Sequence, residues 1–260
     1  MSYEHIVVNQ TDGIVTLTLN HPETLNAMSE EMGEEITAVV REVNQNETAR
    51  VLIVTGAGRA FCAGGSKSGL QNRTTGTGRR EPPKAFYERF LTLRQVEIPT
   101  IAAINGPAVG AGFCIALACD LRVIASTAKV GLNFTRIGIH PGMAGTYTTP
   151  LLVGMARACE MIFTGRLYSG DEAFAMGLAN RVVPAEQVLE EALSLARDIC
   201  GSAPIAVRLA KKALYHNDAA RLDAAIELES EYQAFTWTTE DSKEGIAAMV
   251  EKRKPLFKGK

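Results

Sequence analysis

Two stretches of the sequence share one order: a run of apolar and β-branched residues that predicts a strand, a turn of small residues, and a predicted helix. The first is VLIVTGAGRAFCAGGSKSG, which begins at Val51. The second is NGPAVGAGFCIALACD, which begins at Asn105 and follows the run PTIAAI. A further β-branched run, LRVIA, comes directly after it. Strands that alternate with helices in this way predict an α/β fold.

The flanking segments extend this pattern. The runs IVV and IVTLTL around Asp12-Gly13 predict two strands joined by a tight turn, and Ser29 is a suitable N-cap for the helix that follows. After Val183-Pro184 only helical patterns occur, with Gly201 and Pro204 between two of them. We therefore predict an α/β core over residues 1–200 and a helical C-terminal region over residues 201–260.

Composition excludes several classes of protein. The chain has 260 residues, of which 46% are hydrophobic, and a formal charge of -2, so no basic field favours nucleic acid or an anionic membrane as a partner. No signal peptide or 18-residue apolar stretch is apparent, which predicts a cytoplasmic protein that does not span a membrane. Five scattered cysteines without a CxxC pair predict reduced, mostly buried thiols. Four histidines without ligand spacing predict no metal site.

The small-residue turns indicate a binding site made of backbone. Gly56-Ala57-Gly58 resembles the start of a dinucleotide-binding motif, but the position of its third glycine holds Phe61. A better interpretation takes the two turns as a pair. Backbone N–H groups at the start of a helix have no partner within the helix, and two such donors can bind the oxyanion that develops on a thioester carbonyl. Small residues leave room for the substrate oxygen.

Six blocks of the sequence, taken together, resemble the crotonase (enoyl-CoA hydratase/isomerase) superfamily. In chain order they are HPETLNAMS, VLIVTGAGRAFCAGG, PTIAAINGPAVGAGFCIALACDLRVIA, GIHPGMAGT, TGRLYSGDEAFAMGLANRVVP and EGIAAMVEKRKPLF. The resemblance implies a crotonase-like spiral of ββα units with a helical C-terminal trimerisation region. It also implies a homotrimer or a hexamer built as a dimer of trimers. The ligand it implies is an acyl-CoA thioester, bound as substrate without another cofactor, in a lyase or isomerase of fatty acid metabolism.

The resemblance also assigns residues to the site. The oxyanion donors would be the backbone N–H groups of Gly65 and Ala111. A second group of residues would bind the substrate: Leu25, Ala27, Ala63, Gly64, Ser66, Cys114, Phe134, Met249 and Lys252. Lys252 is also consistent with a solvated lysine of the basic tail.

The sequence departs from the hydratase pattern at two positions. A hydratase of this superfamily uses two glutamates as acid and base. The corresponding positions hold Cys114 and Phe134. A buried apolar thiol is a better interpretation of Cys114 than a thiolate nucleophile, and Phe134 is expected to shape an acyl pocket. The carboxylate nucleophile of dehalogenating relatives would fall near Gly142, so dehalogenation is not supported. Asp120 matches a structural position.

If the protein catalyses a reaction by proton transfer, a residue other than the two missing glutamates must act as the acid or base. His140, in GIHPGMAG, is the first candidate because an imidazole titrates near neutrality, and a loop histidine at a subunit interface is the alternative. Glu81, Tyr87, Glu88 and Arg89 lie on a lid-like segment and are further candidates. Three functions stay open: an acyl-CoA enzyme with a displaced acid or base, a non-catalytic acyl-CoA-binding protein, and a β-diketone hydrolase.

Overall fold

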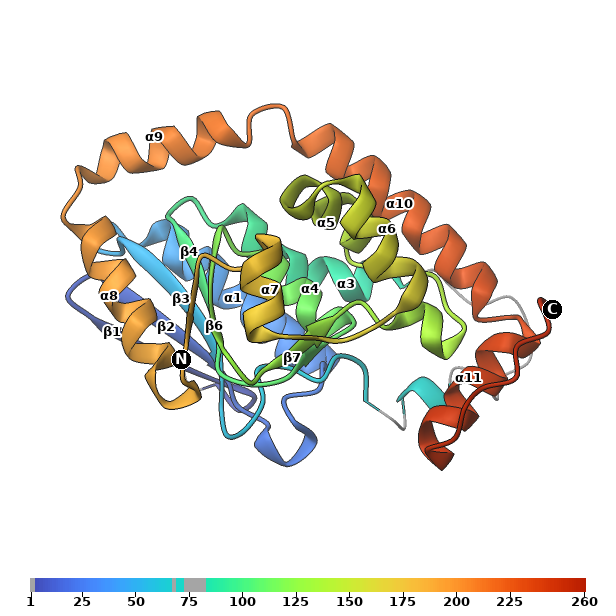
Figure 1. Ribbon diagram of the computed structural model, residues 1–260. Coiled ribbons are helices and arrows are strands. Elements are labelled where there is room, and N and C mark those ends of the chain that lie inside the picture. The colour runs from blue at the N-terminus through green and yellow to red at the C-terminus, as the bar shows by residue number, and fades with distance from the viewer. Residues whose placement is uncertain (1–2, 67–68, 73–82) are drawn as a thin grey trace.

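The computed structural model describes residues 3–66, 69–72 and 83–260 (Figure 1). Its main sheet has six strands in the order β1-β2-β3-β4-β6-β9. These strands are β1 (Ile6–Thr11), β2 (Ile14–Leu19), β3 (Val51–Gly56), β4 (Thr100–Ile104), β6 (Leu121–Ala125) and β9 (Arg181–Val183). β1 and β2 pair antiparallel, and every later pair in this sheet is parallel. The predicted α/β class is confirmed.

The first two strands form the hairpin expected from the sequence. Asp12 and Gly13 both have left-handed φ angles, +50° and +80°. Two such residues in a row make a turn whose twist matches that of the strands it joins, and glycine accepts this conformation at little cost. The turn brings Thr11 opposite Ile14, which fixes the register of the hairpin.

The central parallel strands are fully enclosed. Every residue of β3 and β4 is buried. Helix α8 (Val188–Cys200) contacts β2, β3, β4, β6 and β9. Helix α4 (Ala111–Leu117) contacts β4, and α1 (Glu30–Gln45) contacts β1. Because parallel strands are covered on both faces, they appear in the sequence as continuous apolar runs rather than as alternating patterns. The runs VLIVTG and TIAAI have this form, so the sequence predicted both as buried strands.

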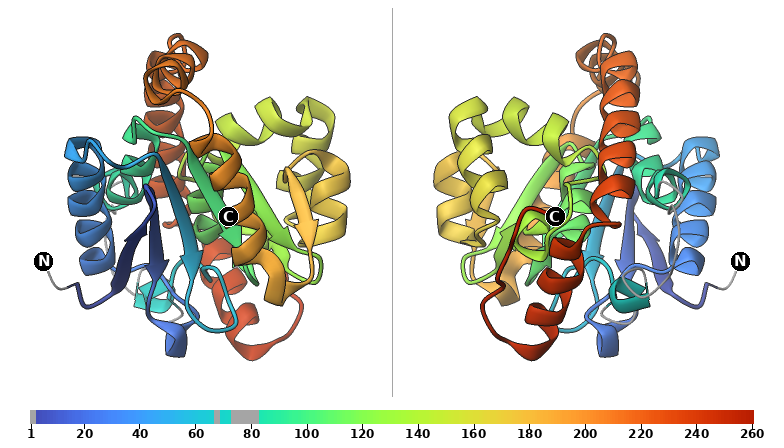
Figure 2. Two further views of the ribbon diagram at one scale, coloured as in Figure 1. Left: turned by 90° about the vertical axis from the view of Figure 1, so that its left-hand side faces the viewer. Right: turned by 90° about the vertical axis from the view of Figure 1, so that its right-hand side faces the viewer.

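A smaller sheet and a helical layer complete the core. The three-stranded sheet has the order β5-β7-β8, with β5 (Ala108–Val109), β7 (Lys129–Gly131) and β8 (Tyr168–Ser169). β5 leads directly into α4, so the second small-residue turn links a strand of this sheet to a helix beside the main sheet. Helices α5 (Gly145–Val153), α6 (Met155–Thr164) and α7 (Gly170–Met176) lie on the opposite side of the molecule from α1 (Figure 2).

The chain after β9 is helical, as predicted. Helix α9 (Pro204–Leu214) spans the top of the molecule in Figure 1, and α10 (Ala219–Thr236) runs down the side away from α8 towards α11 (Glu240–Glu251). The predicted division at residue 200 falls between α8 and α9, and it stays a prediction that these parts are separate units. Within the described residues, no helix is both long enough and apolar enough to cross a bilayer.

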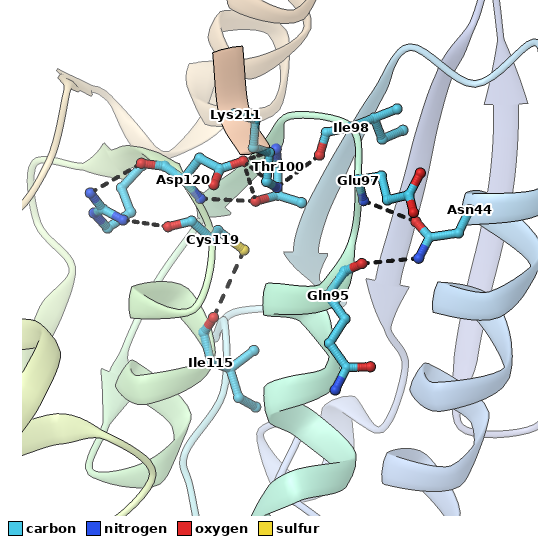
Figure 3. Close-up of polar contacts among 10 residues, drawn as sticks. Asn44, Gln95, Glu97, Ile98, Thr100, Ile115, Cys119, Asp120 and Lys211 are labelled. Atoms are coloured by element: carbon cyan, nitrogen blue, oxygen red, sulfur yellow. Dashed lines mark hydrogen bonds and ion pairs between the residues drawn. The ribbon is translucent and has the colours of Figure 1, made fainter. Parts of the chain in front are cut away.

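A polar cluster fastens α9 to the core (Figure 3). One carboxylate oxygen of Asp120 accepts hydrogen bonds from the backbone N–H of Thr100 at 2.7 Å and from its hydroxyl at 2.9 Å. The same oxygen lies 2.7 Å from Nζ of Lys211, which also donates to the carbonyl oxygen of Ile98 at 2.9 Å. Asp120 therefore has the structural role expected from the sequence, because it joins α9 to the start of β4.

This cluster generates the first prediction. The substitution Lys211→Met should lower the free energy of unfolding by roughly 1–3 kcal/mol, because it leaves the shielded Asp120 carboxylate without its cation. Urea unfolding followed by circular dichroism measures the change. The exposed neighbour Lys212 is the control, and Lys212→Met should leave the free energy of unfolding nearly unchanged. Equal effects of the two substitutions would contradict a role for this ion pair.

Candidate active site

The two small-residue turns lie in direct backbone contact. Cys62 and Ala108 form an isolated parallel bridge between them. A Cβ on Gly112 would lie 2.2 Å from the carbonyl oxygen of Cys62, and a Cβ on Gly64 would lie 2.6 Å from that of Val109. Since neither approach leaves room for a side chain, both positions require glycine. The position of the Gly64 Cβ would also be only 3.4 Å from the amide nitrogen of Ala111, so the two turns meet beside that amide.

Each turn presents an unpaired N–H group. Ala111 is the first residue of α4, and its N–H therefore has no acceptor within the helix. Gly65 bridges Met28, but the hydrogen bond at that bridge runs from Met28 N–H to the carbonyl oxygen of Gly64. Neither Gly65 nor Ala111 donates its N–H to any other described residue. This is the arrangement that two oxyanion donors from separate turns require.

These two residues line a cavity of about 530 Å³. Its wall is mainly apolar and aromatic, and within the described part of the chain its titratable members are Glu30 and Tyr87. The full wall consists of Met28, Ser29, Glu30, Ala63, Gly65, Ser66, Gly69, Leu70, Phe86, Tyr87, Val109, Gly110, Ala111, Asn133, Phe134, Ile137, Ile139, Trp237 and Met249.

Half of the residues predicted for the site lie in this wall. They are Ala63, Gly65, Ser66, Ala111, Phe134 and Met249. Gly64 lies directly behind the wall, where it packs against the second turn. The carbonyl oxygen of Leu25 accepts a hydrogen bond from the Ala63 N–H at 3.0 Å and so stabilises the first turn. Neither Leu25 nor Ala27 lines the cavity. Lys252 is exposed at the end of α11 and is also outside the wall.

Cys114 is a buried thiol rather than part of the wall. Its side chain is 1% exposed, and its Sγ lies 3.5 Å from the carbonyl oxygen of Gly142. Burial raises the pKa of the Cys114 thiol well above its usual value, so the group stays protonated at neutral pH. The structure thus agrees with an apolar role for Cys114 and gives no support to a thiolate nucleophile or to a substrate contact.

Phe134 belongs to the apolar part of the cavity. It is 4% exposed, and its ring lies 3.8 Å from the position that a Cβ on Gly110 would take. Phe86 and Trp237 add two further aromatic side chains to the wall. Where a hydratase of the superfamily would have a carboxylate, this chain therefore presents an aromatic surface, which suits an acyl or aryl group.

His140 lies beside α10 instead of in the cavity wall. Its backbone N–H donates to the hydroxyl of Thr236 at 2.9 Å. The ring nitrogen Nδ1 is 2.7 Å from the carbonyl oxygen of Pro141. The ring packs edge-to-face on Tyr232, with 5.2 Å between the ring centroids. Burial lowers the pKa of His140 below 6.5, so the imidazole is neutral at pH 7.

The lid candidates are divided between two cavities. Tyr87, in α3 (Lys84–Leu91), lines the cavity beside the turns, and its hydroxyl donates to Oε1 of Gln233 at 2.8 Å. Glu88 and Arg89 line a larger cleft of about 680 Å³ that faces the C-terminal helices. Its members Arg94 and Asp218 pair at 2.6 Å, and this cleft shares no lining residue with the cavity that contains the two free N–H groups. Glu81 lies outside the described residues.

A buried glutamate that the sequence analysis did not single out binds the start of α5, close to the loop that contains His140. Glu229 of α10 is 1% exposed and accepts hydrogen bonds from the N–H groups of Ala144 and Thr146, both at 2.7 Å. It also accepts one from the Thr146 hydroxyl at 2.5 Å. Burial raises the pKa of Glu229, against the effect of these hydrogen bonds. The carboxylate caps the start of α5 and so fixes the loop that contains His140 and Gly142.

No cluster of three or more His, Cys, Asp or Glu side chains suited to a metal occurs within the described ranges.

Comparison with known proteins agrees with this geometry. The family model for enoyl-CoA hydratase/isomerase matches residues 9–260. The chain belongs to this family. Among its relatives, a crotonyl-CoA hydratase of Syntrophomonas wolfei is 36% identical over 258 residues and covers 99% of both chains. A 1,2-epoxyphenylacetyl-CoA isomerase of Escherichia coli is 34% identical over 263 residues, also with 99% of both chains covered.

Solved structures show the same fold. An enoyl-CoA hydratase/isomerase from Pseudoalteromonas atlantica superposes with a TM-score of 0.87 at 28% identity, over 98% of this chain and 100% of that one. An enoyl-CoA hydratase from Bacillus anthracis is 37% identical, with a TM-score of 0.76 over 99% of this chain and 100% of that one. The crotonase fold predicted from the sequence is confirmed, and the chain is an enoyl-CoA hydratase/isomerase-like enzyme.

The position of His140 generates the second prediction. We expect His140→Gln to keep turnover within about threefold of the wild type, because the imidazole does not line the cavity, whereas loss of a true acid or base costs about 100-fold or more. A drop of that size would assign proton transfer to His140, as the sequence predicted.

The same variant has a pH signature. Since burial lowers the pKa of His140 in the folded state, the unfolded chain takes up the proton more readily. The neutral His140 therefore costs no unfolding free energy above pH 6.5, the ordinary pKa that applies in the unfolded chain. As the pH falls from there through the lower pKa of the folded state, protonation of the unfolded chain lowers the unfolding free energy. Between pH 7 and pH 5, His140→Gln should lose less unfolding free energy than the wild type, with His216→Gln at an exposed position as the control.

Proposed function

We propose that the enzyme binds an acyl-CoA thioester in the cavity and stabilises its enolate with the N–H groups of Gly65 and Ala111. The observation that carries the proposal is the presence of two unpartnered N–H groups, from adjacent turns, in the wall of an apolar cavity. As the thioester loses its α-proton, negative charge collects on the carbonyl oxygen. Donors already in place stabilise that charge without reorganisation.

The same wall argues against efficient hydration of crotonyl-CoA. Hydration needs one group to activate water and another to protonate the α-carbon. Cys114 is a buried thiol and Phe134 is apolar, so the two positions of the hydratase pattern provide neither. Glu30 and Tyr87 are the titratable groups of the described wall. These two groups are available to move a proton at an enolate, as in isomerisation, and one relative is named an isomerase.

A non-catalytic acyl-CoA-binding protein is the second candidate function. Its support is the lack of a carboxylate pair in the described wall, where Glu30 is the one carboxylate. A β-diketone hydrolase would rely on histidine chemistry, and the placement of His140 outside the wall gives it less support.

We also propose that the enzyme works in the cytoplasm, as expected from the sequence. A further part of the proposal is that it assembles as a homotrimer or a dimer of trimers. Large apolar side chains on α9 and α10 are exposed, among them Ile205 at 73%, Leu209 at 60% and Phe235 at 70%. Surfaces of this kind commonly mark contacts between subunits.

The third prediction tests the ligand class. Butyryl-CoA and benzoyl-CoA should raise the melting temperature, because a ligand that binds only the folded state stabilises it. Crotonyl-CoA should bind similarly but show weak or no hydration when its absorbance is followed. Rapid hydration would contradict the argument from the missing glutamates, and no stabilisation by any thioester would contradict the ligand class.

The fourth prediction tests the oxyanion donor. Proline is tolerated at the first position of a helix but has no N–H, so Ala111→Pro removes the donor while α4 keeps its starting conformation. We expect turnover to fall about 100-fold or more. Ala111→Gly keeps the N–H and is the matched control, with turnover expected within about threefold of the wild type. Equal turnover in both variants would exclude this amide as a donor.

A further inference from the structure

One polar side chain in the cavity wall has no hydrogen-bond partner among the described residues. Asn133 comes directly before Phe134 and lines the cavity while half-buried. Its carboxamide makes no hydrogen bond to any described residue, and it does not cap the short helix that follows it. The other half-buried or buried asparagines near the turns differ in this respect. The side chain of Asn26 bonds three carbonyl oxygens, and that of Asn105 bonds those of Gly56 and Gly58.

Asn133 also lies next to the proposed oxyanion donor. Its Oδ1 is 3.0 Å from the position that a Cβ on Gly110 would occupy, and Gly110 directly precedes Ala111. Gly110 has a φ of +57°, so glycine is favoured there by the backbone conformation. The amide group is thus held beside the part of the cavity where a thioester carbonyl would be bound.

Apolar side chains follow Asn133 along the chain. Phe134, Ile137 and Ile139 follow it along the same wall, and all three are buried. The half-buried carboxamide lines the cavity without a protein hydrogen bond among the described residues, so a ligand oxygen can replace water on it. Since the carboxamide both donates and accepts, it suits a hydroxyl or a keto oxygen. A carboxylate suits it less, because the described wall contains no Lys or Arg to balance that charge.

We propose that Asn133 is a specificity-determining residue that binds a hydroxyl or keto oxygen on the acyl group close to the thioester. The preferred ligands are thus 3-oxygenated acyl-CoA esters rather than plain saturated ones. This inference rests on the proposed function, because it requires an acyl-CoA in the cavity with its carbonyl oxygen at Ala111.

Binding of three ligands with the same chain length tests it. Isothermal titration calorimetry of the full-length protein is performed with butyryl-CoA, 3-hydroxybutyryl-CoA and 3-oxobutyryl-CoA. The wild type should bind each oxygenated ester about tenfold more tightly than butyryl-CoA, as expected for one additional hydrogen bond. Asn133→Leu, of similar size but apolar, should reduce both ratios to about one while keeping butyryl-CoA binding.

A second variant distinguishes the two oxygens. Asn133→Asp can accept from a hydroxyl but, when ionised, cannot donate to a keto oxygen. It should therefore keep more of the preference for 3-hydroxybutyryl-CoA than of the preference for 3-oxobutyryl-CoA. Asn217→Leu, at an exposed position, is the control and should leave all affinities unchanged.

Failure of this inference is distinct from failure of the proposed function. If butyryl-CoA binds but the wild type shows no preference for the oxygenated esters, or if Asn133→Leu keeps the preference, the role of Asn133 is overturned and acyl-CoA binding stands. If none of the three esters binds, the proposed function is overturned together with the inference.

Discussion

The close backbone packing of the two small-residue turns is the contact on which the rest of the site depends. Gly112 faces the carbonyl oxygen of Cys62, and Gly64 faces that of Val109, at distances that exclude any side chain. This contact brings the first turn beside the amide of Ala111, and neither Ala111 nor Gly65 donates its N–H to another described residue. Because both turns follow buried strands and pack on each other through their backbones, the donors are in place before a ligand arrives, which is the condition for stabilising a developing charge.

Buried polar groups hold the C-terminal helices against this centre. Asp120 and Lys211 join α9 to the start of β4, and Glu229 of α10 caps the start of α5. Gln233 joins the same region to the site, because it donates to the carbonyl oxygen of His140 and accepts from the Tyr87 hydroxyl. Trp237, directly after α10, lines the cavity itself. The helical region after residue 200 therefore completes the site as well as covering the core.

The site combines two backbone N–H donors, those of Gly65 and Ala111, with a mainly apolar cavity wall. Family membership and the fold are shared with named hydratases and an isomerase, but the side chains at the hydratase positions are a thiol and a phenyl ring. Tyr87 and Asn133 then supply polar groups from other elements of the wall, with Glu30. Selectivity in such a site depends on which oxygens of the ligand find partners, since apolar contacts discriminate weakly.

The sequence by itself determined local elements of the fold. Continuous apolar runs predicted β3 and β4, and Asp12-Gly13 predicted the hairpin, because each signal comes from residues adjacent in the chain. The assignment of Gly65 and Ala111 as oxyanion donors came from the resemblance to the crotonase superfamily and stays a prediction. Only the tertiary structure decided which side chains face the cavity. Ile139 lies in its wall while its neighbour His140 turns to Tyr232, and Glu229 meets Ala144 across 85 residues. Contacts between distant segments depend on how helices dock, and local pattern does not encode that docking.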